Sequence, residues 1–263
     1  MSETSPGNIQ VDRSEGIVTV TLNNPSKLNA MTRAMWIQFA EVWEELNEDQ
    51  ETRCIVVTGA GDRGFCPGND IGEFEAFRSN AEKARALSEI MNRGREAMLS
   101  CPFPVVGKIR GACVGGGLEI AAMCDMRICS DNSRFGAPLN RLGLTMAYEE
   151  MLPIWRIADR PTMFEFLVEG RIIDALDAKT RGLVNRVVSA ENLDEEVSAT
   201  AQAIGDGPPL VHRWHKRFFN RLERDIPLTD ADHDEHYLAF ETQDYQTGYK
   251  SFLAKTKPVF RGR

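Results

Sequence analysis

The chain has 263 residues, of which 42% are apolar and 27% are charged, an ordinary composition for a globular protein with one substantial core. Its formal net charge is −8, and because a duplex-binding domain normally needs a basic face, nucleic acid is not an expected partner. The sequence contains no apolar run of eighteen residues or more, and it starts with a polar segment. Neither a membrane span nor a signal peptide is therefore predicted.

Cysteine usage fits a reducing compartment. None of the six cysteines forms a C-x-x-C pair and several lie in apolar runs, which is typical of buried thiols in a cytoplasmic protein. No cluster with metal-ligand spacing appears, so no metal is predicted. The six are Cys54, Cys66, Cys101, Cys113, Cys124 and Cys129.

The first part of the chain predicts two strands, a helix and a third strand. Residues 8–13 and 16–22 are rich in β-forming side chains, with a Glu-Gly turn between them. A helix is expected over about 33–49, where apolar residues recur at helical spacing. The apolar run 54–58 is typical of a buried parallel strand.

Two glycine-rich loops interrupt the next part of the chain. The first covers 59–72 and precedes a helix predicted over 80–99. The second, Gly111 to Gly117, follows an apolar strand predicted over 105–110. The remaining predicted elements are a helix over 118–124, strands over 126–130 and 184–188, and mainly helix after about 147.

Strands that alternate with helices predict an α/β fold built from parallel β–α units, with a helix-rich final third. No short-period repeat, low-complexity segment or Gly/Ser linker separates the parts. The expected organisation is a disordered tail over 1–7, a core over 8–200 and a helical C-terminal region over 201–263.

The two glycine loops are the best candidates for binding chemistry. They read G-F-C-P-G-N-D-I (64–71) and G-A-C-V-G-G-G-L-E-I (111–120). Glycine lets a backbone approach a ligand closely, and the first N–H groups of a helix have no internal acceptor. Two such groups that converge would bind a carbonyl oxygen and stabilise an oxyanion. For either loop alone, a tight turn is the simpler interpretation.

The order of the motifs resembles that of the crotonase family, also called the enoyl-CoA hydratase/isomerase family. F-C-P-G-N-D-I and G-A-C-V-G-G-G-L-E-I-A-A-M-C-D are similar to two signatures of that family, and L-N-N-P-S-K-L-N-A-M (22–31) is similar to a third. Four shorter segments, F-G-A-P, R-L-G-L, G-L-V-N and K-P-V-F, follow in the family's order. The resemblance spans residues 8 to 260.

The resemblance implies a crotonase (ClpP-like) spiral of ββα units with an α-helical C-terminal trimerisation region, assembled as a homotrimer or a dimer of trimers. It implies an acyl-CoA substrate, with coenzyme A as part of that substrate and no tightly bound cofactor. It assigns the oxyanion donors to the N–H groups of Asn69 and Gly116. The positions that it assigns to substrate or CoA contacts are Lys27, Asn29, Ala30, Gly68, Asp70, Ile71, Gly115, Leu139, Lys257 and Phe260.

Glu119 is the strongest acid–base candidate. It lies in the apolar segment L-E-I-A-A-M (118–123), where a carboxyl must be solvated, paired or neutral, and where desolvation would raise its pKa. An ordinary first-turn glutamate, stabilised by the helix dipole, is the alternative that the residues leave open. The resemblance matches Glu119 to one of the two hydratase glutamates and so favours a catalytic role.

The second hydratase glutamate is missing. Family hydratases carry it directly after F-G-x-P, and Leu139 stands at that position. Glu149 and Glu150 are possible compensating acids, although a place in the first turn of a helix is their simpler interpretation.

The main hypothesis is an acyl-CoA-processing enzyme, enoyl-CoA hydratase/isomerase-like, with Glu119 as acid or base. Leu139 keeps two alternatives open. One is a relative with different chemistry (dehydratase, dienoyl isomerase, decarboxylase or thioesterase), and the other is a non-catalytic CoA-binding or assembly protein. RNA binding is a third class, against which the acidic balance counts.

Overall fold

Two sheets organise the computed structural model, which describes residues 7–223 and 226–263. The larger sheet has the strand order β1-β2-β3-β5-β7-β10 and the smaller one the order β4-β6-β8-β9. The strands of the larger sheet are β1 (Asn8–Ser14), β2 (Ile17–Asn23), β3 (Cys54–Gly59), β5 (Val105–Ile109), β7 (Met126–Ser130) and β10 (Arg186–Val188). Those of the smaller sheet are β4 (Gly64–Cys66), β6 (Ala112–Val114), β8 (Arg134–Gly136) and β9 (Ile172–Asp174).

Parallel pairing dominates both sheets. The hairpin of β1 and β2 is antiparallel, and its predicted turn places Glu15 and Gly16 at φ of 51° and 81°. Every later pair of the larger sheet is parallel, whereas the smaller sheet closes with the antiparallel pair β8–β9. The predicted α/β fold with parallel units is confirmed.

The smaller sheet is the main feature that the sequence did not predict. The glycine-rich segments 59–72 and 111–117, expected as loops, each contain a three-residue strand, β4 and β6, which pair in parallel. Strands this short carry no readable hydrophobic period. Their pairing depends on contacts between distant parts of the chain.

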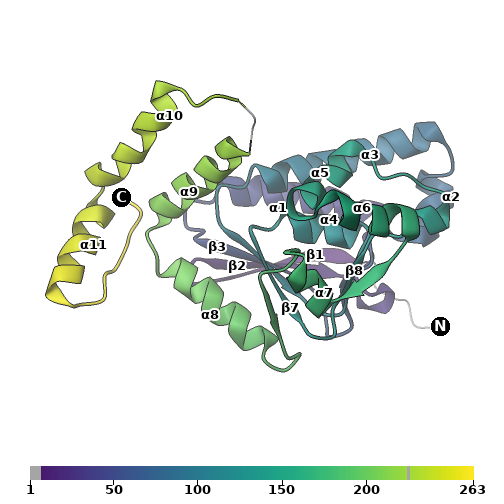
Figure 1. The fold of residues 1–263 in the computed structure, drawn as a ribbon, viewed down its shortest axis with the longest axis horizontal. Helices are drawn as coiled ribbons and strands as arrows, with labels where there is room; N and C mark the ends of the chain where they lie inside the picture. Colours follow the sequence, from purple (N-terminus) through teal and green to yellow (C-terminus); the bar gives the residue numbers. More distant parts are fainter. Residues whose placement is uncertain (1–6, 224–225) are drawn as a thin grey trace.

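Helices surround the sheets and link their strands (Figure 1). They are α1 (Arg33–Glu48), α2 (Phe74–Phe77), α3 (Ala81–Leu99), α4 (Gly116–Met123), α5 (Tyr148–Ile157), α6 (Arg160–Phe164), α7 (Ala175–Thr180), α8 (Leu193–Gly205), α9 (Pro209–Leu222), α10 (Asp230–Asp234) and α11 (Gln243–Ala254). Short helical turns are η1 (Pro25–Lys27), η2 (Ile71–Glu73), η3 (Leu139–Leu142), η4 (Glu165–Glu169) and η5 (Glu235–Glu241).

The larger sheet is buried on both faces, as parallel sheets usually are. On one face, the main core includes Trp36, Phe39 and Trp43 of α1, whose rings meet edge to face with centroids 5.5 and 5.9 Å apart. On the other face, α8 packs a separate apolar cluster against β3, β5 and β7. All six cysteines are free and buried.

The last part of the chain contains the helices α8 to α11. Figure 1 shows α10 and α11 (yellow-green to yellow) extending away from the core beyond α9. The expected boundary at residue 200 falls inside α8. The expected tail over 1–7 lies outside the described residues except for Gly7. Among the described residues, no helix is long and apolar enough to cross a membrane.

Candidate active site

The two glycine loops touch each other so closely that side chains would not fit between them. A Cβ on Gly117 would lie 1.9 Å from the carbonyl oxygen of Cys66, and a Cβ on Gly68 would lie 3.0 Å from the nitrogen of Gly116. Gly68 also has φ of +107°, in the region that favours glycine. Gly68 and Gly117 are therefore required by the close packing of loop on loop, and not only by local turns.

This contact brings together the main-chain nitrogens of Asn69 and Gly116. A Cβ on Gly116 would lie 3.9 Å from the nitrogen of Asn69. Gly116 is the first residue of α4, so its N–H has no acceptor within the helix. Among the described residues, neither N–H donates a hydrogen bond to a main-chain or side-chain acceptor. Both are thus free to bind an acceptor from outside the chain.

The side chain of Asn69 is held by a hydrogen bond to α1. Its Oδ1 accepts a hydrogen bond of 2.6 Å from Nε1 of the buried Trp36 of α1. The peptide group before Asn69 is held separately, because its carbonyl, that of Gly68, accepts the N–H of Met31 at 2.8 Å. The position of the Asn69 N–H therefore depends on the packing of the core.

A cavity of about 250 Å³ opens beside the two N–H groups. Both glycine loops, α2 and the residue after it, η3 and the start of α5 contribute to its lining. The residues that line it are Pro67, Gly68, Asn69, Ile71, Phe74, Arg78, Val114, Gly115, Gly116, Glu119, Pro138, Leu139, Arg141, Leu142, Leu144, Met146 and Glu150.

Glu119 is the most deeply buried charged residue of this cavity, with 1% of its surface exposed. Burial raises the pKa of its carboxyl to about 8, against the opposing influence of the Arg95 guanidinium, and the nearby Glu150 carboxylate adds to the rise. Arg95, itself 3% exposed, donates a hydrogen bond from Nε to Oε1 of Glu119. The side chain is therefore both paired and poised to exchange a proton near neutral pH.

Glu150 and Glu149 have different surroundings. Glu150 is buried in the first turn of α5, where its Oε2 accepts the N–H of Ala147 at 3.1 Å. Its Oε1 lies 3.9 Å from both Arg78 and Arg95. Glu149 is exposed and does not line the cavity. Of the two candidate compensating acids, the fold brings only Glu150 near Glu119.

Arg95 and Arg78 were missed by the sequence analysis. Arg95 lies on the buried face of α3, four residues after Met91 and three before Met98. A charged residue on an apolar stripe is the signal that would have found it. Arg78 follows α2 and carries no such signal, because its place in the cavity depends on how α2 packs.

The predicted substrate-contact residues divide into two groups. Gly68, Ile71, Gly115 and Leu139 line the cavity. Asp70 does not line it but is buried next to Ile71, where it caps η2 through the N–H of Gly72 (3.0 Å) and pairs with Lys27 (2.5 Å).

The other predicted contacts lie away from the cavity. Asn29 is buried under the first loop and donates to the carbonyls of Ala60 and Gly64, and Ala30 is buried beside it. Lys257 pairs with Asp206 at 2.7 Å, and the Phe260 ring lies against Gly248 of α11. A role for these four residues in CoA binding remains a prediction.

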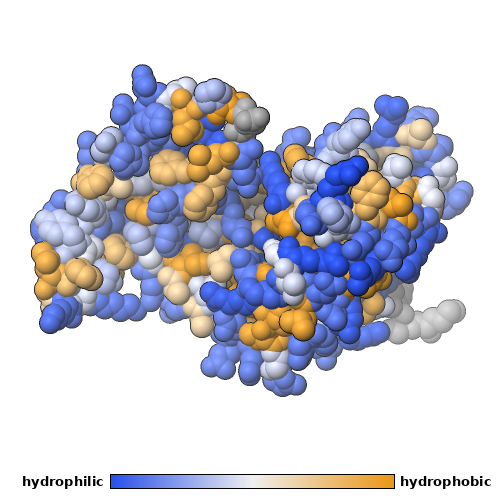
Figure 2. Space-filling model, viewed as in Figure 1, coloured by the Kyte–Doolittle hydropathy of each residue, from blue (hydrophilic) through white to orange (hydrophobic). Residues whose placement is uncertain are grey.

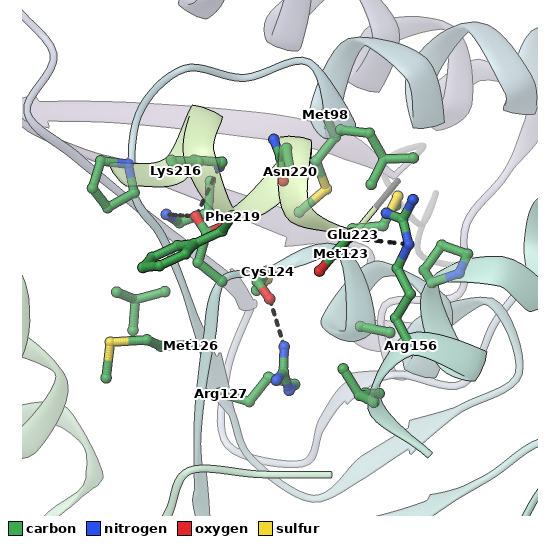
Figure 3. A pocket seen from close by; sticks show the side chains of 18 of the residues that line it. Met98, Met123, Cys124, Met126, Arg127, Arg156, Lys216, Phe219, Asn220 and Glu223 are labelled. Carbon is green, nitrogen blue, oxygen red and sulfur yellow. Dashed lines mark hydrogen bonds and ion pairs between the residues drawn. The ribbon is translucent and has the colours of Figure 1, made fainter. Parts of the chain in front are cut away.

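A second, larger cavity of about 570 Å³ lies between α9 and the core (Figure 3). Several of its charged groups already have partners: Lys216 pairs with Asp125 at 2.7 Å, and Arg156 pairs with Glu223 at 3.3 Å. It contains neither of the two free N–H groups. The smaller cavity at the glycine loops is therefore the candidate active site.

Comparison with known proteins agrees with this fold and motif order. The family model described as enoyl-CoA hydratase/isomerase matches residues 12–263. The chain belongs to this family. Enoyl-CoA hydratase/isomerase family members are enzymes, and the predicted family and enzyme class are both confirmed.

Individual relatives cover nearly the whole chain. The crotonyl-CoA hydratase of Syntrophomonas wolfei is 30% identical over 256 residues, which are 96% of this chain and 97% of that protein. The short-chain-enoyl-CoA hydratase of Clostridium acetobutylicum is 29% identical over 252 residues, or 95% and 96%. A crystal structure of an enoyl-CoA hydratase/carnithine racemase from Magnetospirillum magneticum superposes with a TM-score of 0.95 at 44% identity, covering 97% of this chain and 96% of that one.

Proposed function

We propose that this protein processes acyl-CoA thioesters, with the N–H groups of Asn69 and Gly116 as an oxyanion hole and Glu119 as acid or base. One observation carries the proposal: two main-chain N–H groups with no partner among the described residues lie close together beside a buried carboxyl in a single cavity. A thioester oxygen between these donors would bind more strongly as it gains negative charge in an enolate-like state. One such donor typically lowers a barrier by about 3–4 kcal/mol.

Glu119 would supply the proton transfer. A carboxyl with a pKa of about 8 can both hold and release a proton near neutral pH. Leu139 presents an apolar wall where family hydratases carry their second glutamate, so a second acid has to come from elsewhere. Glu150 is that acid in our proposal, because it is the other carboxyl that residues 7–223 and 226–263 contribute to the lining of the cavity. The reaction that this arrangement favours is enoyl-CoA hydration or isomerisation.

Coenzyme A would extend out of the cavity as part of the substrate, with no other cofactor bound. We assign Lys27, which is half exposed beside η2 and pairs with Asp70, to contact with its phosphates. Lys257 and Phe260 do not line the cavity of their own chain, so we assign them to the CoA of a neighbouring copy in a homotrimer or a dimer of trimers. Buried free thiols suit the cytoplasm, where we place the enzyme.

The test is turnover of crotonyl-CoA, followed by loss of the enoyl absorbance. Glu119→Gln keeps the size of the side chain but removes the exchangeable acid. We expect its kcat to fall by about 100-fold or more, the usual contribution of general acid–base catalysis, while butyryl-CoA binding is kept. Turnover that survives in Glu119→Gln would contradict the assigned role.

A non-catalytic CoA-binding protein is the second candidate, favoured by Leu139 and by the Arg95 hydrogen bond that already engages Glu119. Its signature would be CoA binding without turnover across a panel of enoyl-, dienoyl-, hydroxyacyl- and malonyl-type thioesters. Turnover of one member of the panel in place of crotonyl-CoA would instead assign the protein to one of the other chemistries of the family.

A further inference from the structure

Arg78 is a cation of the cavity lining, and its guanidinium N–H groups have no hydrogen-bond acceptor among the described residues. Its side chain is 15% exposed. Its nearest acidic group is Oε1 of Glu150 at 3.9 Å, beyond hydrogen-bond distance. The ring of Phe74 lies 5.3 Å from the guanidinium carbon and supports it from one side. A guanidinium offers five N–H donors, so this group is ready for an acceptor.

The other charged groups around Arg78 are already engaged. Arg95 bonds to Glu119, and the Glu150 carboxylate accepts the N–H of Ala147. Arg141 donates to the carbonyl of Gly170 at 2.7 Å. Arg78 is therefore the cation of this lining that lacks a hydrogen-bonded partner among the described residues.

The charge balance of the cavity points the same way. Arg78 and Arg141 line the cavity together with two carboxyls, Glu119 and Glu150, and the buried Arg95 contacts both carboxyls from outside the lining. Because the pKa of Glu119 is raised to about 8, this carboxyl is largely protonated at neutral pH. In that state three guanidinium groups lie around one carboxylate, because the partner of Arg141 is a neutral carbonyl. An anionic group on the ligand would reduce this excess of positive charge, whereas a purely apolar acyl chain would leave Arg78 desolvated and unpaired.

We propose that Arg78 recognises a carboxylate on the acyl group, so that the substrate class is a short-chain acyl-CoA with a second, free carboxyl. This inference rests on the proposed acyl-CoA function. The remaining walls, which include Ile71, Leu142 and Met146, are apolar and suit the carbon chain between the thioester and that carboxylate. A planar guanidinium supported by Phe74 binds a carboxylate through two parallel hydrogen bonds.

The test compares the binding of two saturated thioesters of similar structure, butyryl-CoA and glutaryl-CoA, by isothermal titration, which needs no turnover. We expect the protein to bind glutaryl-CoA at least about tenfold more tightly, as a charge-assisted hydrogen bond allows. Arg78→Gln should remove that preference and leave butyryl-CoA affinity nearly unchanged. Arg78→Lys keeps the charge and should retain part of the preference for glutaryl-CoA. It replaces Arg78→Gln as the test variant if Arg78→Gln does not fold. Arg85→Gln, an exposed arginine of α3, is the control and should bind as the wild type does.

Three outcomes would overturn the inference, and each has a distinct consequence. Equal affinity of the wild type for both thioesters would rule out recognition of a carboxylate on the acyl group, while the proposed acyl-CoA function would still stand. An equal loss of both affinities in Arg78→Gln would show that Arg78 binds a phosphate of CoA instead. If the wild type bound neither thioester, the proposed acyl-CoA function would be contradicted as well.

Discussion

Burial and the charge of Arg95 shift the pKa of Glu119 in opposite directions. Loss of water raises the pKa of its carboxyl to about 8, while the adjacent Arg95 guanidinium opposes that rise. Arg95 also donates to Oδ1 of Asn92, so it is held from two sides in the wall behind the cavity. We infer that Arg95 is a positioning residue, because it holds the Glu119 carboxyl in one orientation and tunes its proton affinity.

Replacing Arg95 by methionine tests this role. Because the nearest cation is lost, the pKa of Glu119 should rise above its present value, and the corresponding limb of the pH–rate profile should move to higher pH. That direction holds whether the acid or its conjugate base is the active form. The buried polar groups left unpaired should lower the free energy of unfolding by about 1–3 kcal/mol. Both effects are measurable, from kcat between pH 6 and pH 10 and from urea unfolding.

Arg93→Gln is the matched control, since Arg93 lies on the same helix and pairs with Glu44 at the surface, 2.5 Å away. Its pH profile and stability should stay near those of the wild type. A limb that stays in place in Arg95→Met, with kcat reduced equally at every pH, would show that Arg95 serves only the fold.

The start of α4 is the element on which the site depends. Gly116 and Gly117 occupy its first turn, but their surroundings differ. A Cβ on Gly117 would collide with the Cys66 main chain, whereas the nearest atom to a Cβ on Gly116 is the Cα of Gly68 at 3.4 Å. Substitutions at these two positions therefore distinguish the effect of loop packing on stability from the effect of helix propensity.

Gly117→Ala and Gly116→Ala form a matched pair. The first should force the two loops apart and lower the free energy of unfolding by about 1–3 kcal/mol or more, as overpacking does. The second should change the free energy of unfolding little. The tight contact of its Cβ with Gly68 at 3.4 Å is offset by the helix propensity of alanine, which exceeds that of glycine by up to about 1 kcal/mol. Thermal and urea unfolding would rank them. Similar losses for both variants would contradict the assigned role of the Gly117–Cys66 contact.

On the scale of the whole molecule, the C-terminal helices leave large apolar side chains uncovered. Phe252 and Leu253 of α11 are 82% and 75% exposed, and Figure 2 shows apolar (orange) side chains on the arm formed by α10 and α11. Exposed apolar surface of this kind is typical of a protein–protein interface. It supports our proposal of a trimer, or a dimer of trimers, in which this arm packs on a neighbouring copy.

Charge placed on that arm should break the assembly. We expect the wild type to elute as a trimer or hexamer in size-exclusion chromatography with light scattering, and Phe252→Asp/Leu253→Asp to shift the mass toward that of one chain, because burying these carboxylates in an interface is costly. Gln243→Glu, an exposed polar position of the same helix, controls for added charge alone. A monomeric wild type would contradict the proposal.

Local chemistry made much of the fold predictable. The helix expected over 33–49 is observed as Arg33–Glu48, since the Thr32 side chain caps it and its apolar period is clear. The helix expected over 118–124 instead begins at Gly116, because glycine has no helix preference of its own and the loop contact places it there. The strands inside the glycine loops escaped prediction for the same reason.

The sequence by itself determined the family, the α/β fold and the positions of the two glycine loops and Glu119, because these depend on residue order and on periods within one element. Only the tertiary structure decided that Arg95 meets Glu119, that Glu150 rather than Glu149 lines the cavity, and that Arg78 lines it without a hydrogen-bonded partner in the described part of the chain. Such pairings join residues of different elements. Their distances follow from how helices pack on the sheets, and no local pattern in the chain encodes that packing.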